Sequence, residues 1–373
     1  MKSDPYPWEA LFATNESHGP GVTVPMRLVR KQRRPFLLLP FQSRAAAATL
    51  ELYPAQTARA RVARTLLRLA LRCGLAAGTE KVQFIFRPAS AFGQFISRQA
   101  DRGGEFPVIG VLAGNAATPG QRFLVLVFDK QLRPVAVVKA GTTGRAIELV
   151  HVESAFLSAA PAHTRGVPKL RGALNVPGLS ALALDFFPGH SPQPQDSPGL
   201  LPLLSSWVDA SRQVRVSELS DWTRLKSVAG ASKELGYVAT YLEGTRICPA
   251  ICHGDFAPWN IKVSPRGDWT VLDWERGQLI GMPAWDWFHY WLQQAMLVER
   301  VPVSILVGRV ESLLASDPSK EYFGLAGISG AERPLLLAYL HHCIEVIKPS
   351  EGLSATRDLL TALQSRWAGR LGG

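Results

Sequence analysis

The spacing of apolar residues changes once along this chain, and that change limits the possible fold more than any other feature. Up to residue 187, short runs rich in Val, Ile, Leu and Phe are separated by turn residues such as Gly, Pro and Asn, a pattern typical of strands. We expect strands at 82–86, 107–112, 123–128 and 135–139, a helix at 145–160, and two further strands within 168–187.

Beyond the segment 188–198, which contains Pro, Gly and Ser, apolar residues recur at helical spacing. Helices are expected at 201–214, 217–243, 285–298, 303–314, 332–347 and 355–371. A β-rich part followed by an α-rich part, joined by a short linker, predicts an α+β, two-lobed protein. The expected parts are an N-terminal extension (1–80), a β-rich N-lobe (81–187) and a mostly helical C-lobe (188–373).

Positive charge is concentrated in the N-terminal extension. The first 100 residues hold 15 of the 41 Lys and Arg residues but only five of the 30 Asp and Glu residues. The rest of the chain is therefore almost neutral, unlike a typical nucleic-acid-binding protein, in which a basic surface forms the binding site. The excess charge describes the extension and carries no information about the chemistry of the two lobes.

The extension contains one expected amphipathic helix, at 55–73. Val62, Leu66, Leu69 and Cys73 share one face, and several arginines share another. Two interpretations are open: a solvated basic face on a helix that packs against the next domain, or a weak contact of residues 1–75 with an anionic surface such as a membrane or nucleic acid. The sequence favours the first.

Composition excludes several classes of protein. With 47% hydrophobic and 19% charged residues, the chain can bury a large core and is not globally disordered. Its four cysteines form neither a disulfide framework nor a zinc-finger spacing, so reduced thiols in the cytoplasm are expected. No secretory leader is visible, and no apolar run approaches the ~20 residues of a transmembrane helix.

The residues that indicate chemistry lie in two short motifs. His253-Gly254-Asp255 forms a tight turn, Asn260 follows five residues after Asp255, and Asp273 ends a short apolar run. A turn at 265–268 is expected to fold the run before Asp273 back onto 261–263, which brings Asp255, Asn260 and Asp273 to one rim. Two carboxylates and a carboxamide are hard oxygen ligands suited to Mg²⁺ and to phosphoryl transfer.

These motifs resemble the signature of the aminoglycoside phosphotransferase and choline kinase superfamily, small-molecule kinases with a protein-kinase-like fold. The resemblance covers about residues 105–370 and rests on His253-Gly254-Asp255, Asn260 and Asp273-Trp274-Glu275 in this order. It implies that Asp255 is the catalytic base and that Asn260 and Asp273 bind Mg²⁺. It also implies that Asp286 supports the catalytic loop.

The resemblance extends to residues expected to bind ATP. Lys139 matches the lysine that anchors the phosphates, and its partner would be a glutamate on the next helix, either Glu153, which we prefer, or Glu148. The glycine-rich segment with Gly114 and Gly120 occupies the place of the loop that covers the phosphates, although an ordinary hairpin loop fits it equally well. The backbone from Asp185 to Phe187 would contact the adenine.

The sequence therefore predicts an enzyme that transfers the γ-phosphoryl group of ATP, with Mg²⁺, to a hydroxyl of a small molecule such as a sugar or amino alcohol. The alternative is a catalytically silent, kinase-like nucleotide-binding or scaffold protein. Six of the ten tryptophans lie within 259–291. Aromatic side chains of this kind either line an acceptor site by stacking or form core contacts.

Overall fold

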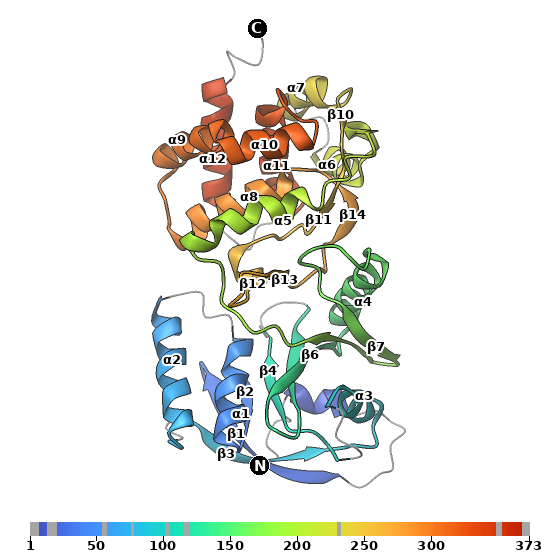
Figure 1. Cartoon of the computed structure of the whole chain (residues 1–373), viewed down its shortest axis with the longest axis vertical. Coiled ribbons are helices and arrows are strands. Elements are labelled where there is room, and N and C mark those ends of the chain that lie inside the picture. The colour runs from blue at the N-terminus through green and yellow to red at the C-terminus, as the bar shows by residue number, and fades with distance from the viewer. Residues whose placement is uncertain are drawn as a thin grey trace. The chain divides into compact units, whose positions relative to one another are not determined.

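A computed structural model describes residues 7–12, 21–53, 58–75, 78–100, 105–114, 120–229, 233–347 and 353–367. The chain forms two compact units (Figure 1). Unit 1 comprises Met1–Ala159 and Pro168–Phe187, and unit 2 comprises Ala160–Val167 and Pro188–Gly373. No helix among these described ranges is both long enough and apolar enough to span a bilayer.

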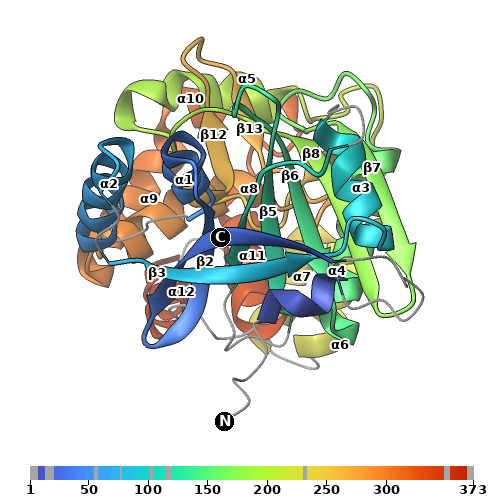
Figure 2. The same cartoon turned by 90° about the horizontal axis from the view of Figure 1, so that it is seen from below.

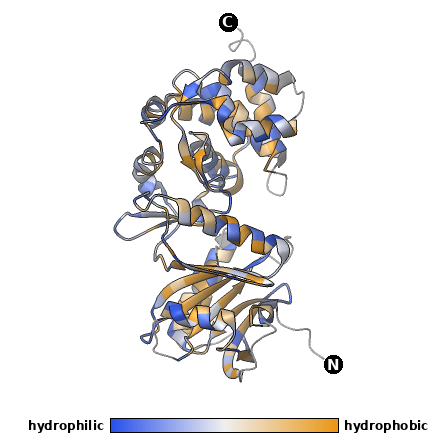
Figure 3. Cartoon of the chain, turned by 90° about the vertical axis from the view of Figure 1, so that its right-hand side faces the viewer, coloured by the Kyte–Doolittle hydropathy of each residue, from blue (hydrophilic) through white to orange (hydrophobic). Residues whose placement is uncertain are grey.

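The described residues of unit 1 form one antiparallel sheet of eight strands in the order β3-β1-β2-β4-β5-β6-β8-β7. The strands are β1 (Val22–Lys31), β2 (Arg34–Pro40), β3 (Glu80–Phe86), β4 (Ile109–Ala113), β5 (Arg122–Phe128), β6 (Pro134–Gly141), β7 (Leu170–Val176) and β8 (Leu179–Asp185). Apolar residues dominate the central strands, as the colouring of Figure 3 shows. The strands expected at 82–86, 107–112, 123–128 and 135–139 are confirmed as β3 to β6, and the two expected within 168–187 as β7 and β8.

Helices cover both faces of this sheet, because successive side chains of a strand point to opposite faces. On one face, Leu38 and Val125 pack with α3 (Ala91–Ala100) and the 3₁₀ helix η1 (Pro7–Phe12). On the other face, Leu37 and Leu126 pack with α1 (Ser43–Thr49) and with Leu71 of α2 (Ala58–Arg72). The unit therefore has two apolar layers with the sheet between them.

The N-terminal part differs from the sequence prediction. The extension expected at 1–80 contributes β1 and β2 to the sheet as its second and third strands, and β2 pairs with β4. These strands were not predicted because basic residues interrupt the apolar pattern in the sequence. β1 contains Arg27, Arg30 and Lys31, yet it buries Met26 and Leu28 on its core face. The helices α1 and α3 were also not expected.

Helix α2 is present, but its predicted apolar face is not its packing face. Leu71 is buried and Leu67 is partly buried against the sheet, whereas Val62, Leu66, Leu69 and Cys73 are exposed. Figure 2 shows α2 beside α1. Helix α4 (Gly144–Ala159), expected at 145–160, contacts β6 and β8.

Unit 2 is mostly helical, as expected. The helices are α5 (Leu200–Ser205), α6 (Ser220–Ala229), α7 (Lys233–Leu242), α8 (Trp285–Gln293), α9 (Val303–Ala315), α10 (Asp317–Leu325), α11 (Glu332–Glu345) and α12 (Leu353–Trp367). Helix α11 is buried over most of its length and contacts α6, α7, α8 and α12. It is therefore the centre of this unit. The helix expected at 201–214 ends at Ser205, and the one expected at 217–243 is two helices, α6 and α7.

The described residues of this unit also form three two-stranded sheets: β9 (Val214–Arg215) with β10 (Arg246–Ile247), β11 (Ala250–Cys252) with β14 (Gln278–Gly281), and β12 (Ile261–Val263) with β13 (Trp269–Val271). The expected hairpin is confirmed, since Ile261 pairs with Val271 and Val263 with Trp269. An α+β protein with an antiparallel N-terminal sheet and a helical C-terminal region is thus the observed architecture.

Candidate active site

The first motif is a loop between β11 and the β12–β13 hairpin. Gly254 has a φ of 77°, and a Cβ on it would lie 2.9 Å from Cβ of Arg276. Only glycine avoids both the left-handed strain and this contact. The loop can therefore turn sharply between His253 and Asp255.

Asp255 and Asn260 lie side by side in this loop. The Asn260 side-chain nitrogen Nδ2 donates to the backbone oxygen of Asp255 at 2.9 Å and to its carboxylate Oδ2 at 3.0 Å. These two bonds fix the orientation of both side chains. They also turn the carboxamide oxygen Oδ1 of Asn260 away from the Asp255 carboxylate.

Asp286, at the start of α8, holds the loop from behind. Its carboxylate is buried and accepts the backbone N–H of His253 at 2.6 Å and that of Gly254 at 3.1 Å. Burial raises the pKa of this carboxyl, against the lowering effect of the His253 charge and of the two backbone bonds. These contacts support the loop, as the family resemblance implies for Asp286.

His253 connects the first motif to the second. Its Nδ1 accepts the backbone N–H of Asp255 at 3.2 Å, and its Nε2 lies 2.9 Å from the backbone oxygen of Leu272. The Leu272 N–H donates to the backbone oxygen of Asn260 at 2.7 Å. The peptide just before Asp273 is therefore tied to both His253 and Asn260.

Asp273 follows in the left-handed region, with a φ of 74°. Non-glycine residues are uncommon there, and such backbone strain concentrates at functional sites. The residue that the resemblance implies as a metal ligand thus has an uncommon backbone conformation.

His289, one turn after Asp286 on α8, was not predicted as a site residue. Its Nε2 lies 3.1 Å from Oδ1 of Asp255, and its Nδ1 lies 2.9 Å from the hydroxyl of Tyr339 on α11. The Asp286-x-x-His289 spacing, which places both side chains on one helix face, could have drawn attention to this histidine. Nothing in the sequence indicated Tyr339, since it lies on α11, 50 residues after His289.

The pair of His289 and Asp255 is charged. Burial disfavours the imidazolium, but the bond to the Asp255 carboxylate, with Cys343, outweighs it and raises the pKa of His289 to about 9. Burial likewise opposes ionisation of Asp255, yet His289, His253 and Arg276 hold the pKa of that carboxyl below its usual value. Asp255 is therefore a carboxylate at neutral pH, with Oδ1 on His289 and Oδ2 on Asn260.

In unit 1, Lys139 and Glu153 form an ion pair. Lys139 lies on β6 between β5 and β8, and its Nζ is 2.5 Å from Oε2 of Glu153 on α4. The glutamate is fully buried and the lysine side chain is 12% exposed. Glu148 instead pairs with Arg145 on the exposed side of α4. Of the two candidate partners, the geometry thus joins Glu153 to Lys139.

The glycine-rich segment connects β4 to β5, and residues 115–119 lie outside the described part. Gly114 accepts the Gln121 side-chain amide at 3.1 Å, and a Cβ on it would lie 2.4 Å from the backbone oxygen of Arg122. A Cβ on Gly120 would lie 3.0 Å from Leu149 of α4. Gly114 is therefore required by the close hairpin backbone, and a phosphate-binding role for either glycine remains a prediction.

The predicted adenine segment lies at the end of β8. Asp185 pairs with Ala136 of β6, and the Phe186 N–H donates to the backbone oxygen of Val135 at 3.2 Å. The Asp185 carboxylate accepts Arg171 at 3.1 Å. Phe187 is half-buried. The segment is thus an extended strand end, and its contact with adenine remains a prediction.

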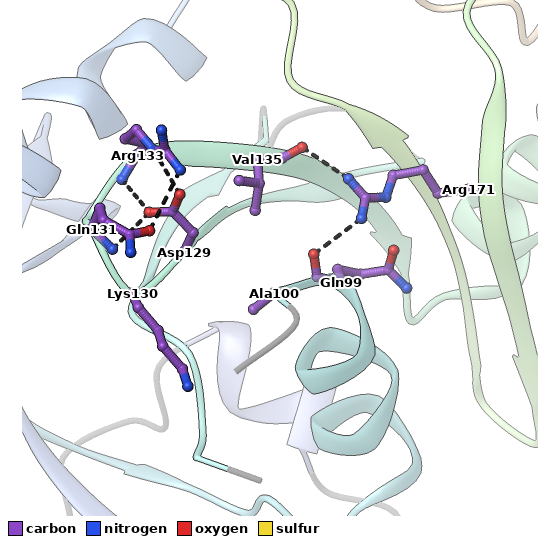
Figure 4. Close-up of a pocket in the computed structure, with 8 residues that line it drawn as sticks. All are labelled: Gln99, Ala100, Asp129, Lys130, Gln131, Arg133, Val135 and Arg171. Carbon is purple, nitrogen blue, oxygen red and sulfur yellow. Dashed lines mark hydrogen bonds and ion pairs between the residues drawn. The ribbon is translucent and has the colours of Figure 1, made fainter. Parts of the chain in front are cut away.

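A surface pocket of about 360 Å³ opens in the same unit, lined in part by Asp129, Arg133 and Arg171 (Figure 4). Arg133 donates to Asp129 at 2.8 Å, and Arg171 donates to the backbone oxygens of Val135 and Gln99. The arginines thus brace the walls of the pocket. None of the predicted site residues lines it.

The donor atoms fit Mg²⁺, although within the described ranges no three His, Cys, Asp or Glu side chains gather to bind a metal ion by themselves. Asn260 Oδ1 and the Asp273 carboxylate are hard oxygen ligands. Mg²⁺ is usually bound by one or two protein oxygens and completes its shell with phosphates and water. Two protein donors, Asn260 and Asp273, would therefore suit a site that binds Mg²⁺ only together with a nucleotide.

The tryptophans of α8 are largely packing residues. Trp287 stacks on Tyr322 at 5.5 Å, and Trp285 lies on the ring of His342 at 4.5 Å. The indole nitrogens of Trp285, Trp287 and Trp291 are buried and find no hydrogen-bond partner among the described residues. Trp285 and His342 come from α8 and α11, the two helices that also carry His289 and Tyr339.

Comparison with known proteins finds similarity only at the level of structure: no protein-family model and no curated protein sequence matches the chain. A protein assigned as a fructosamine-3-kinase from Haemophilus somnus is 15% identical, with a TM-score of 0.45 over 72% of this chain and 95% of that chain. Aminoglycoside phosphotransferase APH(4)-Ia is 12% identical, with a TM-score of 0.45 over 75% of this chain and 98% of that chain.

APH(3'')-Id from Streptomyces rimosus is 11% identical, with a TM-score of 0.37 over 62% of this chain and 90% of that chain. A mutant of APH(4)-Ia has been crystallised as a ternary complex with AMP-PNP and hygromycin B. All these similarities are at low identity, so the roles of residues in this chain are inferred from its own geometry. The solved structures that the chain is similar to are thus those of aminoglycoside phosphotransferases and of a protein assigned as a fructosamine-3-kinase.

Proposed function

We propose that this protein is a kinase that transfers the γ-phosphoryl group of ATP to a hydroxyl group of a small molecule. The observation that carries the proposal is the arrangement at Asp255. Its carboxylate is ionised, is held by Asn260 and His289, and lies on a loop fixed by Asp286. A positioned carboxylate of this kind is the base that phosphoryl transfer requires.

The reaction assigns each residue a task. Asp255 orients the acceptor hydroxyl and takes its proton as the new oxygen–phosphorus bond forms and the bond to the leaving ADP oxygen breaks. His289 compensates the charge of the carboxylate before the transfer. Asn260 and Asp273 would hold Mg²⁺, which, when bound, neutralises charge on the phosphates. Lys139, kept in place by Glu153, would pair with a phosphate group.

The charges around Asp255 favour a particular kind of acceptor. Arg276 lies against Gly254, and His289 is cationic at neutral pH. Both positive charges act on the Asp255 carboxylate, so this carboxylate offers little attraction to a cationic acceptor such as an aminoglycoside or choline. We therefore expect an uncharged or anionic hydroxyl compound, such as a sugar or sugar acid.

The test is phosphoryl transfer from labelled ATP, with Mg²⁺, to a panel of neutral, anionic and cationic hydroxyl compounds. Wild-type protein should phosphorylate a member of the panel, and Asp255→Asn should lose at least 10²-fold in kcat, about the contribution of general acid–base catalysis. ATP affinity should stay within a few-fold. Asp317→Asn, a change at a fully exposed carboxylate of α10, serves as the matched control.

Two results would contradict the proposal. Near-normal turnover in Asp255→Asn would remove Asp255 from the role of base. Absence of nucleotide binding at millimolar ATP and Mg²⁺ would instead favour a catalytically silent, scaffold-like protein.

A further inference from the structure

Helix α2 carries two apolar stripes, although a helix on the surface of a protein needs only one. Leu67 and Leu71 form the first stripe and pack against the sheet of unit 1. Val62, Leu66 and Leu69 form the second and are 59%, 62% and 53% exposed. Single exposed apolar residues are common on protein surfaces. A row of them along one helix is a surface feature that requires an explanation.

The exposed stripe continues beyond these three residues. Cys73, one turn after Leu69, is exposed on the same side, and Leu75 is 63% exposed just after the helix ends. Residues at positions i, i+4, i+7 and i+11 lie within a narrow sector of a helix with 3.6 residues per turn. The stripe, defined as Val62, Leu66, Leu69 and Cys73, therefore runs along more than half of α2 and ends one residue beyond it.

Arginines border this stripe on both sides. At about 100° per residue, Arg61, Arg68 and Arg72 lie along one border and Arg59 along the other. Arg59, Arg61 and Arg72 are exposed, whereas Arg68 lies 3.6 Å from Glu51. No acidic residue occurs within α2. The helix thus presents an apolar stripe between positive borders, at the most basic part of the chain.

We propose that this face of α2 binds the surface of an anionic membrane, with its apolar stripe in the headgroup–acyl boundary and its arginines on lipid phosphates. The combination of arginines and apolar residues on this face indicates which kind of partner it binds. A protein core would not need arginines on both borders, and a nucleic acid would not need the apolar stripe. Interfacial membrane helices combine these two features. Binding of this kind is independent of phosphoryl transfer and brings the enzyme to a lipid surface.

The test is co-sedimentation of the full chain with vesicles of phosphatidylcholine, with and without phosphatidylserine. Binding should require phosphatidylserine and should weaken when added salt shortens the Debye length from about 10 to about 3 Å. A fluorophore that reports polarity, attached to the exposed Cys73, should shift to the blue in the bound state. Thermal unfolding of each variant checks that it is folded, so the test does not depend on the proposed kinase activity.

Two triple variants separate the contributions. Val62→Gln with Leu66→Gln and Leu69→Gln should weaken binding at least about tenfold, because the apolar insertion is lost. Arg59→Gln with Arg61→Gln and Arg72→Gln should weaken it about 100-fold, at about fivefold for each arginine. The matched controls change exposed residues elsewhere, namely Val228, Val298 and Ile305 for the first set and Arg212, Arg266 and Arg300 for the second.

Three outcomes would overturn the proposal. The first is equal binding to vesicles with and without phosphatidylserine, or none to either. The second is binding to a nucleic-acid duplex that needs the arginines but not the apolar residues. The third is a dimer in lipid-free solution that the apolar variant dissociates, together with no vesicle binding, because the stripe would then bind a second copy of the chain.

Discussion

His289 Nε2 lies 3.1 Å from Asp255 Oδ1, and the other ring nitrogen of His289 lies 2.9 Å from the hydroxyl of Tyr339. The imidazolium therefore connects the proposed base, on a loop, to the central helix α11. Asp255, Cys343 and Tyr339 are titratable groups that face this ring, and Asp286 and His342 also interact with it electrostatically. The ion pair lowers the pKa of the Asp255 carboxyl and keeps His289 charged up to a pH of about 9.

This pair leads to a prediction about the pH dependence of catalysis. In wild-type protein, kcat/KM should fall on the alkaline side near pH 9, because His289 loses its proton there. In His289→Gln, this alkaline limb should disappear. The acid limb should move to higher pH, because Asp255 loses the charge that lowers its pKa.

The pH–rate profiles of wild type, His289→Gln and His163→Gln test this prediction, since His163 is an exposed histidine of the same unit. His163→Gln should keep the wild-type profile. A uniform loss of rate in His289→Gln, with both limbs unmoved, would mean that His289 is only a packing residue.

The buried pair of Lys139 and Glu153 leads to a second prediction. Removal of either partner breaks this ion pair, and breaking a buried ion pair costs about 3–5 kcal/mol of stability. Glu153→Gln and Lys139→Met should each lower the free energy of unfolding by about this amount. The double variant should lose less than the sum of the two, because both single variants break the same ion pair.

Urea denaturation of the two single variants and the double variant measures this coupling, and Glu148→Gln on the exposed side of α4 is the matched control. Additive losses would show that the two side chains do not depend on each other. If Lys139 also binds a phosphate, Glu153→Gln should raise the Kd for ATP, whereas Glu148→Gln should not.

The sequence revealed the fold class and the motifs because both rest on local patterns. The β12–β13 hairpin and the position of Asn260 beside Asp255 follow from a turn signal and a spacing of five residues. Strand β1 was missed because its arginines, such as Arg27, mask a period-2 pattern whose apolar half is buried. Helix α3 was missed within a region where apolar residues suggested only strands.

Tertiary contacts account for the rest. The stripe on α2 has the period of a packing face, and only the structure shows that Leu67 and Leu71 pack instead. The link from Asp255 through His289 to Tyr339 joins residues 84 positions apart in the sequence. No periodicity encodes such a link, because it depends on how α8 and α11 pack.

Asp286 leads to a third prediction, about the loop. Its two carboxylate oxygens each accept one backbone N–H, from His253 and Gly254. In Asp286→Asn, one oxygen becomes an amide nitrogen that faces an N–H donor, so one bond is replaced by repulsion. We expect a loss of stability of about 1–3 kcal/mol, together with a fall in kcat that exceeds any rise in the KM for ATP.

Thermal unfolding and steady-state kinetics of Asp286→Asn measure both effects. Asp221→Asn is the matched control, because Asp221 is also buried but accepts from Gln278 and from Met282 rather than from the loop that contains His253 and Gly254. If both variants lose the same stability and kcat falls equally in both, Asp286 has no particular effect on the loop.

A final prediction concerns stability against pH and rests on His342, whose Nδ1 is buried without a hydrogen-bond partner among the described residues. Burial, with the nearby charges of Arg224, Arg276 and His289, lowers the pKa of His342 to about 3. The unfolded chain binds a proton at this histidine below a pH of about 6.5, while the folded chain does not. The free energy of unfolding should therefore decrease from pH 6.5 towards pH 3, by up to about 1.4 kcal/mol per pH unit from this residue.

His289 acts in the opposite direction. Its folded pKa is raised to about 9, so its contribution to stability is complete below a pH of about 6.5 and is lost as the pH rises through 9. The contribution of these two residues to the free energy of unfolding should therefore be greatest near pH 6.5, as denaturation across this pH range would measure. His342→Phe, which keeps a ring against Trp285, should reduce the decrease on the acid side only, and His289→Gln the decrease on the alkaline side only. An acid-side slope that His342→Phe leaves unchanged would mean that His342 is already protonated in the folded protein at mildly acidic pH.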